Sequence, residues 1–524
     1  MDFNRTGFLF IPSLLAITLH ELILRRVEVD HLTLPGVLLS GVLFSVLTLT
    51  FGISITVQLY VSFWGTLSIW ILLYRAIWHP LRHYPGPFGA KLSKLWSVKQ
   101  VWTSKWHYHI VQQRLHHEYG DYVRTGPREL TIFDPTAIQA ILGYSSVTSK
   151  GPFYDNMETS LHVTRDKTFH RQRRRIWDNG MKNSLSTFAP RVEEFTDQLL
   201  ALLRSDNGKP VPLLLYCIYY SYDVMAKLAF DRPMGFMKGE QTEVASSILS
   251  TFTNSLDIMG LFYHIPWFLK ATGTLSSFAG PMKEWRDWSV LQMKDRMSRG
   301  NKSDFVAHLI DNTPTDAAGM ELLFGESRLI ISAGTETTSS ALTFAMMQLA
   351  THPKYMLAVR KEYRDNKQNY HCQRTIPMVD AVIHESMRLW SPVFLPAQRV
   401  TPPSGIHING HFIPGNMIVQ MPPFPRFRDP RNFVRPDEFL PERWTTSPEL
   451  VLDRNAATPF STGPYNCVGQ GLAMMELRSV ISRVVDEFDI VLPDGFVAKD
   501  YWNGVKDHLT AGPPPGQLVK FVPV

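Results

Sequence analysis

The chain has 524 residues, of which 44% are hydrophobic and 19% charged, so an intrinsically disordered or collagen-like chain is excluded. Its 53 lysines and arginines against 47 aspartates and glutamates give a net charge of +6, a small excess that argues against nucleic acid as a partner. The three cysteines, Cys217, Cys372 and Cys467, are too few and too far apart for a disulfide framework or a zinc site, which favours a reducing compartment.

The N-terminal region is strongly apolar. From Leu32 to Tyr74 there is no Asp, Glu, Lys, Arg or His. One helix crosses a bilayer with ~20 residues, so this run is long enough for two passes that turn near Gly52 to Ser54. A weaker apolar stretch, Gly7 to Leu24, could be a third pass. We therefore expect residues 1–78 to be a membrane anchor of two or three transmembrane helices; the alternative is a helical hairpin buried in a core.

A proline-rich segment, from Pro80 to Pro87, follows the apolar run. Proline restricts the backbone, so the chain must change direction here and a domain boundary is expected. With three passes, Arg25 and Arg26 lie on the same side as the basic residues after Arg75, which makes that side cytosolic. No second linker interrupts residues 79–524, so we expect one large cytosolic domain, mostly helical with strands clustered late.

Near the C-terminus, Pro459 to Gly469 form a glycine- and proline-containing loop before a helical pattern at Gln470 to Phe488. Gly463 and Gly469 permit a tight turn, and Cys467 stands at the start of the helix, whose dipole favours a thiolate. A thiolate there could bind a metal. A lone buried cysteine, however, is more often inert packing.

Three more segments precede this loop. Ala333 to Thr338 lie in a helix expected from about Asp316 to Leu349, where Gly334 and the hydroxyl residues could loosen the backbone hydrogen bonds. Glu385 and Arg388 are three residues apart on one helix face, and Arg443 follows later. An exposed ion pair at this spacing would contribute only a few tenths of a kcal/mol, or roughly nothing.

Taken together these motifs resemble the cytochrome P450 family. The pattern Phe460-x-x-Gly463-x-x-x-Cys467-x-Gly469 resembles the family's haem-ligand loop, and the other three segments occur in the order that the family requires. The resemblance is to filamentous-fungal members of secondary metabolism, of the tryprostatin B 6-hydroxylase-like group. It implies the cytochrome P450 fold, mainly α with smaller β sheets (α+β).

The resemblance also implies residue roles. Cys467 is the axial ligand of haem iron, Phe460 packs beside it, and Gly463 and Gly469 shape its loop. Glu336 and Thr337 match the acid and alcohol that hydrogen-bond dioxygen and deliver protons; without the loop, a solvated acid and a back-bonded threonine would be the preferred interpretation. Glu385, Arg388 and Arg443 match a buried structural charge network.

The haem propionates need cationic partners. His170 stands where the family usually has tryptophan, and Arg174, four residues on, is an expected propionate ligand. Arg399 matches another. Tyr465, two residues before the cysteine, replaces the Arg or His often found there and brings no positive charge, so the exact propionate ligands stay open.

The function implied is a haem-thiolate monooxygenase of the endoplasmic reticulum membrane, which uses O2 and electrons from NADPH. NADPH–cytochrome P450 reductase is the expected donor and cytochrome b5 a second candidate, with docking expected near Arg171 to Arg175 and at Arg478. The substrate is expected to be an apolar small molecule contacting Leu329, Ile330, Ala333, Val393 to Leu395 and the Leu509-Thr510 turn, although core packing explains these residues equally well. The alternatives are an isomerase or dehydratase of the same fold that does not use O2, and a membrane haem carrier or sensor.

Overall fold

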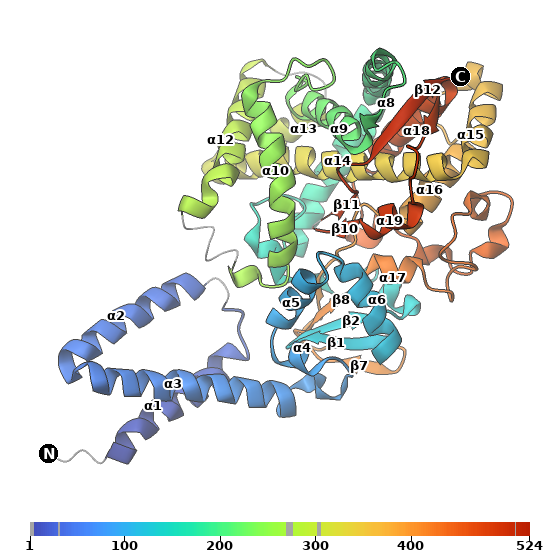
Figure 1. Ribbon diagram of the computed structural model, residues 1–524. Helices are drawn as coiled ribbons and strands as arrows, with labels where there is room; N and C mark the ends of the chain where they lie inside the picture. Colours follow the sequence, from blue (N-terminus) through green and yellow to red (C-terminus); the bar gives the residue numbers. More distant parts are fainter. Residues whose placement is uncertain (1–4, 30–31, 269–275, 301–304, 509) are drawn as a thin grey trace.

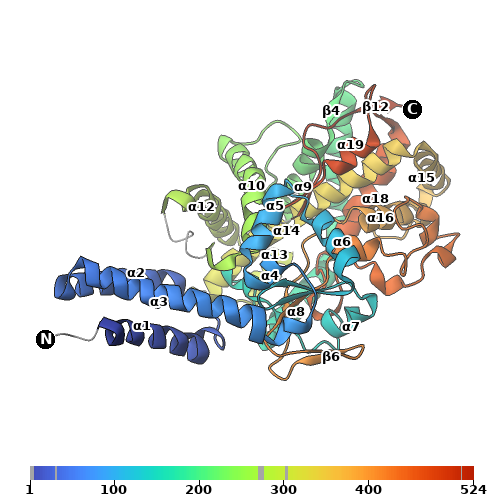
Figure 2. The same ribbon diagram turned by 60° about the horizontal axis from the view of Figure 1, so that its bottom comes forward.

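A computed structural model describes residues 5–29, 32–268, 276–300, 305–508 and 510–524 (Figure 1). Three N-terminal helices project together from one side of a larger body, in which helices surround short strands (Figures 1 and 2). The expected fold class, mainly α with smaller β sheets, is confirmed.

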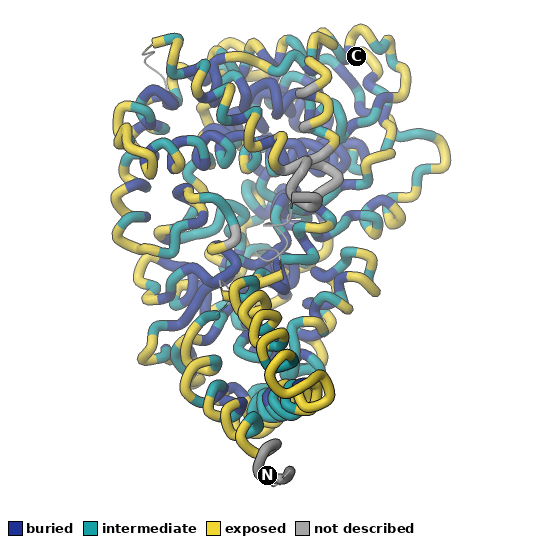
Figure 3. Tube along the Cα trace, turned by 90° about the vertical axis from the view of Figure 1, so that its left-hand side faces the viewer, coloured by how far each residue is buried: buried dark blue, intermediate teal, exposed yellow. Residues whose placement is uncertain are grey.

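The N-terminal helices are α1 (Arg5–Leu19), α2 (Thr33–Phe51) and α3 (Ile53–Leu73). The chain reverses between α2 and α3 at Gly52, where φ is 82°, close to the turn expected from the sequence. The segments Thr33–Phe51 and Ile53–Trp78 are each long and apolar enough to cross a membrane, and α1 is shorter. Figure 3 shows exposed residues running along these helices, in contrast to the buried centre of the body.

The α1 and α3 helices are joined by polar contacts. The Ser13 hydroxyl lies 3.0 Å from that of Ser62 and accepts a hydrogen bond of 2.9 Å from Thr66. Hydroxyl pairs of this kind favour helix association in a bilayer, where water does not compete for them.

The proline-rich linker is fixed to the body. Its 3-10 turn, Pro80–His83, is capped by the His79 ring, which accepts from the Leu81 N–H. A Cβ on Gly86 would come within 2.4 Å of the Arg124 carbonyl oxygen, and the Arg124 N–H donates to Pro85 at 2.7 Å. The change of direction expected from the prolines is therefore held by β-strand contacts and only glycine fits at position 86.

The body contains helices of very different length. The α-helices in its described ranges are α4 (Phe88–Leu92), α5 (Leu95–Thr103), α6 (Tyr108–Tyr119), α7 (Ile138–Ile141), α8 (Lys167–Ser205), α9 (Leu213–Phe230), α10 (Glu243–Phe262), α12 (Ser276–Ser298), α13 (Phe305–Asp311), α14 (Ala317–Thr351), α15 (Pro353–Asp365), α16 (Pro377–Leu389), α17 (Pro423–Phe427), α18 (Gln470–Glu487) and α19 (Ala498–Asn503).

The strands form four small sheets. The largest has the order β1 (Tyr122–Gly126), β2 (Glu129–Ile132), β8 (Ile418–Gln420), β5 (Arg399–Val400), β3 (Ser149–Lys150), and only its β2–β8 pair is parallel among the described pairs. The others are β4 (Val211–Pro212), β12 (Leu518–Pro523) and β9 (Phe488–Val491); β6 (Ile406–Ile408) and β7 (His411–Ile413); and β10 (Lys506–Asp507) and β11 (Ala511–Gly512).

The core is organised around α14, which crosses the body and packs against α9, α16 and α18 (Figure 1). Asp316 caps its N-terminus by accepting from the Gly319 N–H at 2.8 Å. From Ser339 to Ala350 every residue is buried, so this half of the helix is surrounded by protein. The observed bounds agree with the helix expected from about Asp316 to Leu349.

Candidate active site

The loop around Cys467 is shaped by backbone contacts. The Cys467 N–H donates to the Phe460 carbonyl at 2.9 Å, which closes the loop, and the Phe460 side chain packs half-buried against the main core. Gly463 has a φ of 74°, and a Cβ there would lie 2.0 Å from the Leu142 carbonyl oxygen. Gly469, two residues after the cysteine, is the N-cap residue of α18. Phe460, Gly463 and Gly469 therefore all contribute to the position of the sulfur.

The Cys467 sulfur is accessible, although protein surrounds the loop. Cys467 is exposed, whereas Cys217 and Cys372 are buried. Burial nevertheless raises the pKa of the Cys467 thiol, against the lowering effect of the Gly469 amide and Arg174. The helix start does not by itself give the thiolate expected from the sequence, because desolvation outweighs it, and a bound metal would have to displace the proton.

Beside the loop lies a cluster of buried basic groups. Lys150 on β3, His170 on α8 and Arg399 on β5 are each no more than 5% exposed. The Tyr465 ring lies between two of them, 4.8 Å from Lys150 Nζ and 4.8 Å from the Arg399 guanidinium carbon, and the His170 ring contacts it edge-on at 4.6 Å. Tyrosine at this position thus replaces a charge with an aromatic face that holds two cations in place.

These groups lack anionic partners. Within the described ranges no carboxylate pairs with Lys150, His170 or Arg399, and Arg399 Nε is buried without a hydrogen-bond acceptor. Burial and the neighbouring positive charges lower the pKa of Lys150 to about 7 and that of His170 to about 3. A buried cationic cluster without acids is costly unless an anion completes it. Together with the accessible thiol, this donor set fits a haem, with propionates at the cluster and iron at the sulfur.

Arg174, an expected propionate ligand, contacts the cysteine loop. Its guanidinium donates to the Asp178 carboxylate at 2.8 Å and to the carbonyl and side-chain oxygens of Asn466 at 2.6 and 2.7 Å. It therefore holds the residue directly before Cys467, and its charge is partly neutralised by Asp178.

The Ala333 to Thr338 segment is regular α-helix in the structure. Thr337 donates its hydroxyl to the Ala333 carbonyl at 2.6 Å, and α14 runs without interruption. A Cβ on Gly334 would lie 2.4 Å from the Met225 methyl carbon on α9. The loosening expected from Gly334 is therefore not observed; this glycine allows α9 to approach α14 closely.

Glu336, next to Thr337, is a buried acid without a counter-charge. It is 6% exposed, and within the described ranges its Oε1 has no hydrogen-bond partner. Burial raises the pKa of Glu336 to about 7. A carboxyl group with this proton affinity exchanges protons near neutrality, which suits it to proton delivery.

Glu385, Arg388 and Arg443 form a fully buried charge network. Glu385 accepts from Arg388 at 2.8 and 2.9 Å and from Arg443 at 2.9 Å, and all three side chains are fully enclosed. The Trp444 indole also donates to Glu385, at 3.0 Å, and backbone carbonyls accept the remaining Arg388 protons. The hydrogen bonds of this network are satisfied within the protein, and they join α16 to the turn at Pro441–Trp444.

Some of the residues expected to line a substrate pocket keep accessible surface, and others are buried. Ala333 is exposed and Leu329 and Val393 half-buried, whereas Ile330, Phe394 and Leu395 are buried. Phe394 packs among aromatic rings, so core packing accounts for it. Thr510 is half-buried, and Leu509 lies outside the described residues.

Of the arginines expected to dock the reductase, some are exposed and others are paired with carboxylates of the protein. Arg171 and Arg175 are exposed on α8. Arg173 is buried and pairs with Glu326 on α14, and Arg478 is held by Asp380 at 2.7 and 2.8 Å. Arg173 and Arg478 therefore form ion pairs within the protein, whereas the sequence predicts that they belong to a basic docking face.

Comparison with known proteins identifies the class to which this fold and site belong. The model of the cytochrome P450 family matches residues 85–518. The chain therefore belongs to the cytochrome P450 family.

Relatives within the family carry the same description. The "Cytochrome P450 monooxygenase orf5" of Eupenicillium brefeldianum is 35% identical over 85% of this chain and 92% of its own length. The "Cytochrome P450 monooxygenase FCK2" of Fusarium pseudograminearum is 35% identical over 86% and 84%. The "Tryprostatin B 6-hydroxylase" of Neosartorya fischeri is 33% identical over 84% and 82%. The expected enzyme class, a cytochrome P450 monooxygenase similar to those of fungal secondary metabolism, is confirmed.

Sequence reasoning missed Lys150. It belongs to a two-residue strand, and nothing in its neighbourhood in the sequence distinguishes it from a surface lysine. Only its pairing through β5 brings it to Arg399 and Tyr465.

Proposed function

We propose that this chain is a membrane-anchored haem-thiolate monooxygenase that oxidises an apolar small molecule of a fungal secondary-metabolite pathway. One observation carries the proposal: an accessible cysteine lies in a closed loop beside a buried cationic cluster that lacks acids. The sulfur supplies an iron ligand, and Lys150, Arg399 and His170 supply counter-charges and hydrogen bonds for propionates.

When bound, thiolate-ligated haem supplies the chemistry that activates dioxygen. The chain positions and protects that chemistry. The Gly469 amide and the amide of Gln470 donate to the Cys467 sulfur and stabilise its negative charge, and Arg174 holds the adjoining peptide.

Proton delivery is assigned to Glu336 and Thr337. The Glu336 carboxyl takes up and releases protons near pH 7 because it is buried. The Thr337 hydroxyl is held against the Ala333 carbonyl at 2.6 Å, which orients its oxygen as an acceptor toward the accessible side of α14. Side chains of adjacent residues on a helix do not face each other, so we propose that water connects the Glu336 carboxyl to the Thr337 hydroxyl.

The apolar substrate is expected to contact Leu329, Ala333 and Val393, which keep accessible surface. Residues 1–78 are proposed to anchor the protein in the endoplasmic reticulum membrane, with residues 79–524 in the cytosol. Electrons are proposed to come from NADPH through its reductase, with cytochrome b5 as a second donor. Exposed Arg171 and Arg175 give this partner a basic docking face, so raised salt should slow turnover.

The test is spectroscopic. The reduced protein with carbon monoxide is expected to show the red-shifted Soret band of thiolate ligation, and Cys467→His is expected to lose both the band and NADPH-dependent oxidation. Cys372→Ser is the matched control, because Cys372 is buried away from the site, and it should keep the band. A Cys467→His variant that retained the band would refute the ligand assignment.

A further inference from the structure

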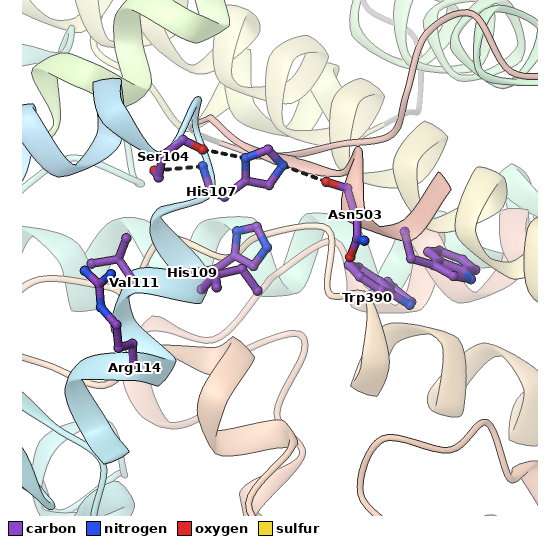
Figure 4. A pocket seen from close by; sticks show the side chains of 9 residues that line it. Ser104, His107, His109, Val111, Arg114, Trp390 and Asn503 are labelled. Atoms are coloured by element: carbon purple, nitrogen blue, oxygen red, sulfur yellow. Dashed lines mark hydrogen bonds between the residues drawn. The ribbon is translucent and has the colours of Figure 1, made fainter. Parts of the chain in front are cut away.

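A second pocket lies apart from the residues assigned to haem. It has a volume of about 430 Å³ and is bordered by the turn between α5 and α6, the first half of α6, Trp390 at the end of α16, and the end of α19 (Figure 4). None of its described lining residues belongs to the Cys467 loop, the cationic cluster or the Glu336 segment. Its size is within the range of small-molecule sites, which is about 300–1,000 Å³.

The rim of the pocket is built by His107. Its Nδ1 lies 2.6 Å from the Ser104 carbonyl oxygen and its Nε2 2.8 Å from the Asn503 carbonyl oxygen (Figure 4). Carbonyl oxygens only accept hydrogen bonds, so in each contact the ring nitrogen is the donor. His107 thereby ties the α5–α6 turn to α19 across the mouth of the pocket.

The turn itself is held in an unfavourable conformation. Lys105 and Trp106 are consecutive non-glycine residues with φ of 52° and 63°. The Trp106 indole donates to the Asp257 carbonyl on α10 at 2.9 Å, and its own carbonyl accepts from the Asp507 N–H at 2.6 Å. Left-handed residues of this kind persist where surrounding contacts over-determine them, often at ligand sites. The pocket is therefore preformed.

One wall is flat and aromatic. The Trp390 and Trp502 indoles stack with centroids 4.7 Å apart and an interplanar angle of 13°. One face of the Trp390 indole lies against Trp502, and the Arg428 guanidinium carbon lies over the ring, 4.9 Å from its centroid. Trp390 therefore offers a planar ligand a rigid apolar ring edge.

A buried polar atom also borders the pocket. His109 is 2% exposed and lies between Phe394 and Phe424, with ring centroids 4.6 Å away, yet within the described ranges its Nδ1 has no hydrogen-bond partner. Burial lowers the pKa of His109 well below its usual value, so the ring is neutral near pH 7. The Nδ1 atom has almost no accessible surface, so His109 closes part of the pocket wall and offers a ligand no polar contact.

The charge of the pocket is positive. Arg114 lines it and donates to the Gln100 side chain at 3.2 Å, and within the described ranges no carboxylate pairs with it. No Asp or Glu is among the described lining residues. We propose that this pocket is a second small-molecule site, which binds a flat aromatic carboxylate with its ring at the indole wall and its carboxylate at Arg114.

Equilibrium dialysis of the full-length, haem-loaded protein measures the binding of 2-naphthoate and of its neutral analogue 2-naphthamide. The difference between them tests whether Arg114 binds the carboxylate. Naphthoate should bind more tightly than the amide. Arg114→Gln should weaken naphthoate binding about fivefold and leave the amide unchanged, since about 1 kcal/mol is typical of such an ion pair. Arg454→Gln, which removes an exposed arginine elsewhere, should change neither.

A second pair of variants tests the location. Ile110 is an exposed lining residue, so Ile110→Trp should fold and fill the pocket, and it should abolish binding of both probes. Leu357→Trp, at an exposed position on α15, is the matched control and should bind both as wild type does. The proposal is overturned if wild type binds neither probe, if Arg114→Gln behaves like Arg454→Gln, or if Ile110→Trp binds naphthoate normally. These measurements need no turnover, so they are independent of the proposed activity.

Discussion

Replacing Lys150 with Met should change how haem retention depends on pH. Burial and the charges of Arg399 and Arg174 lower the pKa of Lys150 from 10.5 to about 7. At about 1.4 kcal/mol for each tenfold change in proton affinity, holding this lysine charged costs on the order of 5 kcal/mol in the haem-free protein. The direction in which this cost changes with pH follows from the lowered pKa, because Lys150 is a base. The cost is fully present below about pH 7, where both the folded and unfolded states are protonated, and it disappears as pH rises toward 10.5.

Haem propionates beside Lys150 would restore its charge, so haem binding should take up a proton above about pH 7. This uptake opposes the proton that the Cys467 thiol releases on ligation, so haem affinity in wild type should fall relative to that of a Lys150 variant as pH rises, by at most about tenfold per pH unit. In Lys150→Met the affinity should be lower, and only the proton release from Cys467 should remain. The control is Arg399→Met, which should also weaken binding and should move the Lys150 effect to higher pH, because the Arg399 charge helps to lower the pKa of Lys150.

The assay is the rate at which the purified protein transfers haem to excess apomyoglobin at about pH 7, 8 and 9. The ratio of the wild-type release rate to that of Lys150→Met should rise with pH from about pH 7, and the same ratio for Arg399→Met should begin to rise at a higher pH. If Lys150→Met kept the wild-type slope, Lys150 would not be the titrating group and the propionate assignment would fail.

Three further outcomes are expected. Glu336→Gln should slow substrate oxidation and remove the limb of its pH profile near 7, and an unchanged profile would exclude a proton-transfer role. Because burial raises the pKa of Glu336 from 4.5 to about 7, the folded wild type is destabilised where this carboxyl is charged, and the variant should be up to about 3 kcal/mol more stable at alkaline pH. Glu385→Gln should leave two buried arginines without their counter-charge and lower the free energy of unfolding by about 3–5 kcal/mol, seen as loss of soluble haem-loaded protein. A urea unfolding midpoint equal to that of wild type would contradict the buried network. Gly334→Val should lower the free energy of unfolding by about 1–3 kcal/mol through collision with Met225. The same substitution should cost less in a chain that already carries Met225→Ala, and an equal cost in both chains would show that this contact is not the cause.

Several features were predictable because their signals are local. The apolar run predicted two helices with a reversal near Gly52, and Asp316 and Pro353 delimit α14 in the sequence as they do in the structure. Capping, proline geometry and hydrophobic length act over a few neighbouring residues, so they can be read without knowledge of the fold. The cysteine loop belongs to the same group, since its glycines shape it from within.

Other features depended on contacts between distant segments. Arg173 was expected on a basic surface, but Glu326, on a helix more than a hundred residues later, buries it. Phe394 was expected at the substrate, but the rings of His109, Trp390 and Phe424 lie around it. The basic charge of a residue is visible in a sequence, whereas its burial is not.

The sequence by itself determined the membrane-length helices, the central helix, the cysteine loop and the family. The tertiary structure alone decided which charges are buried and whether they are paired. It brought Lys150 to Arg399 and Tyr465, left Glu336 without a counter-charge, and formed the pocket at His109 and Arg114. The physical reason is that desolvation and Coulomb interactions depend on which groups lie within a few ångströms, and strand pairing and helix packing set that proximity across the whole chain.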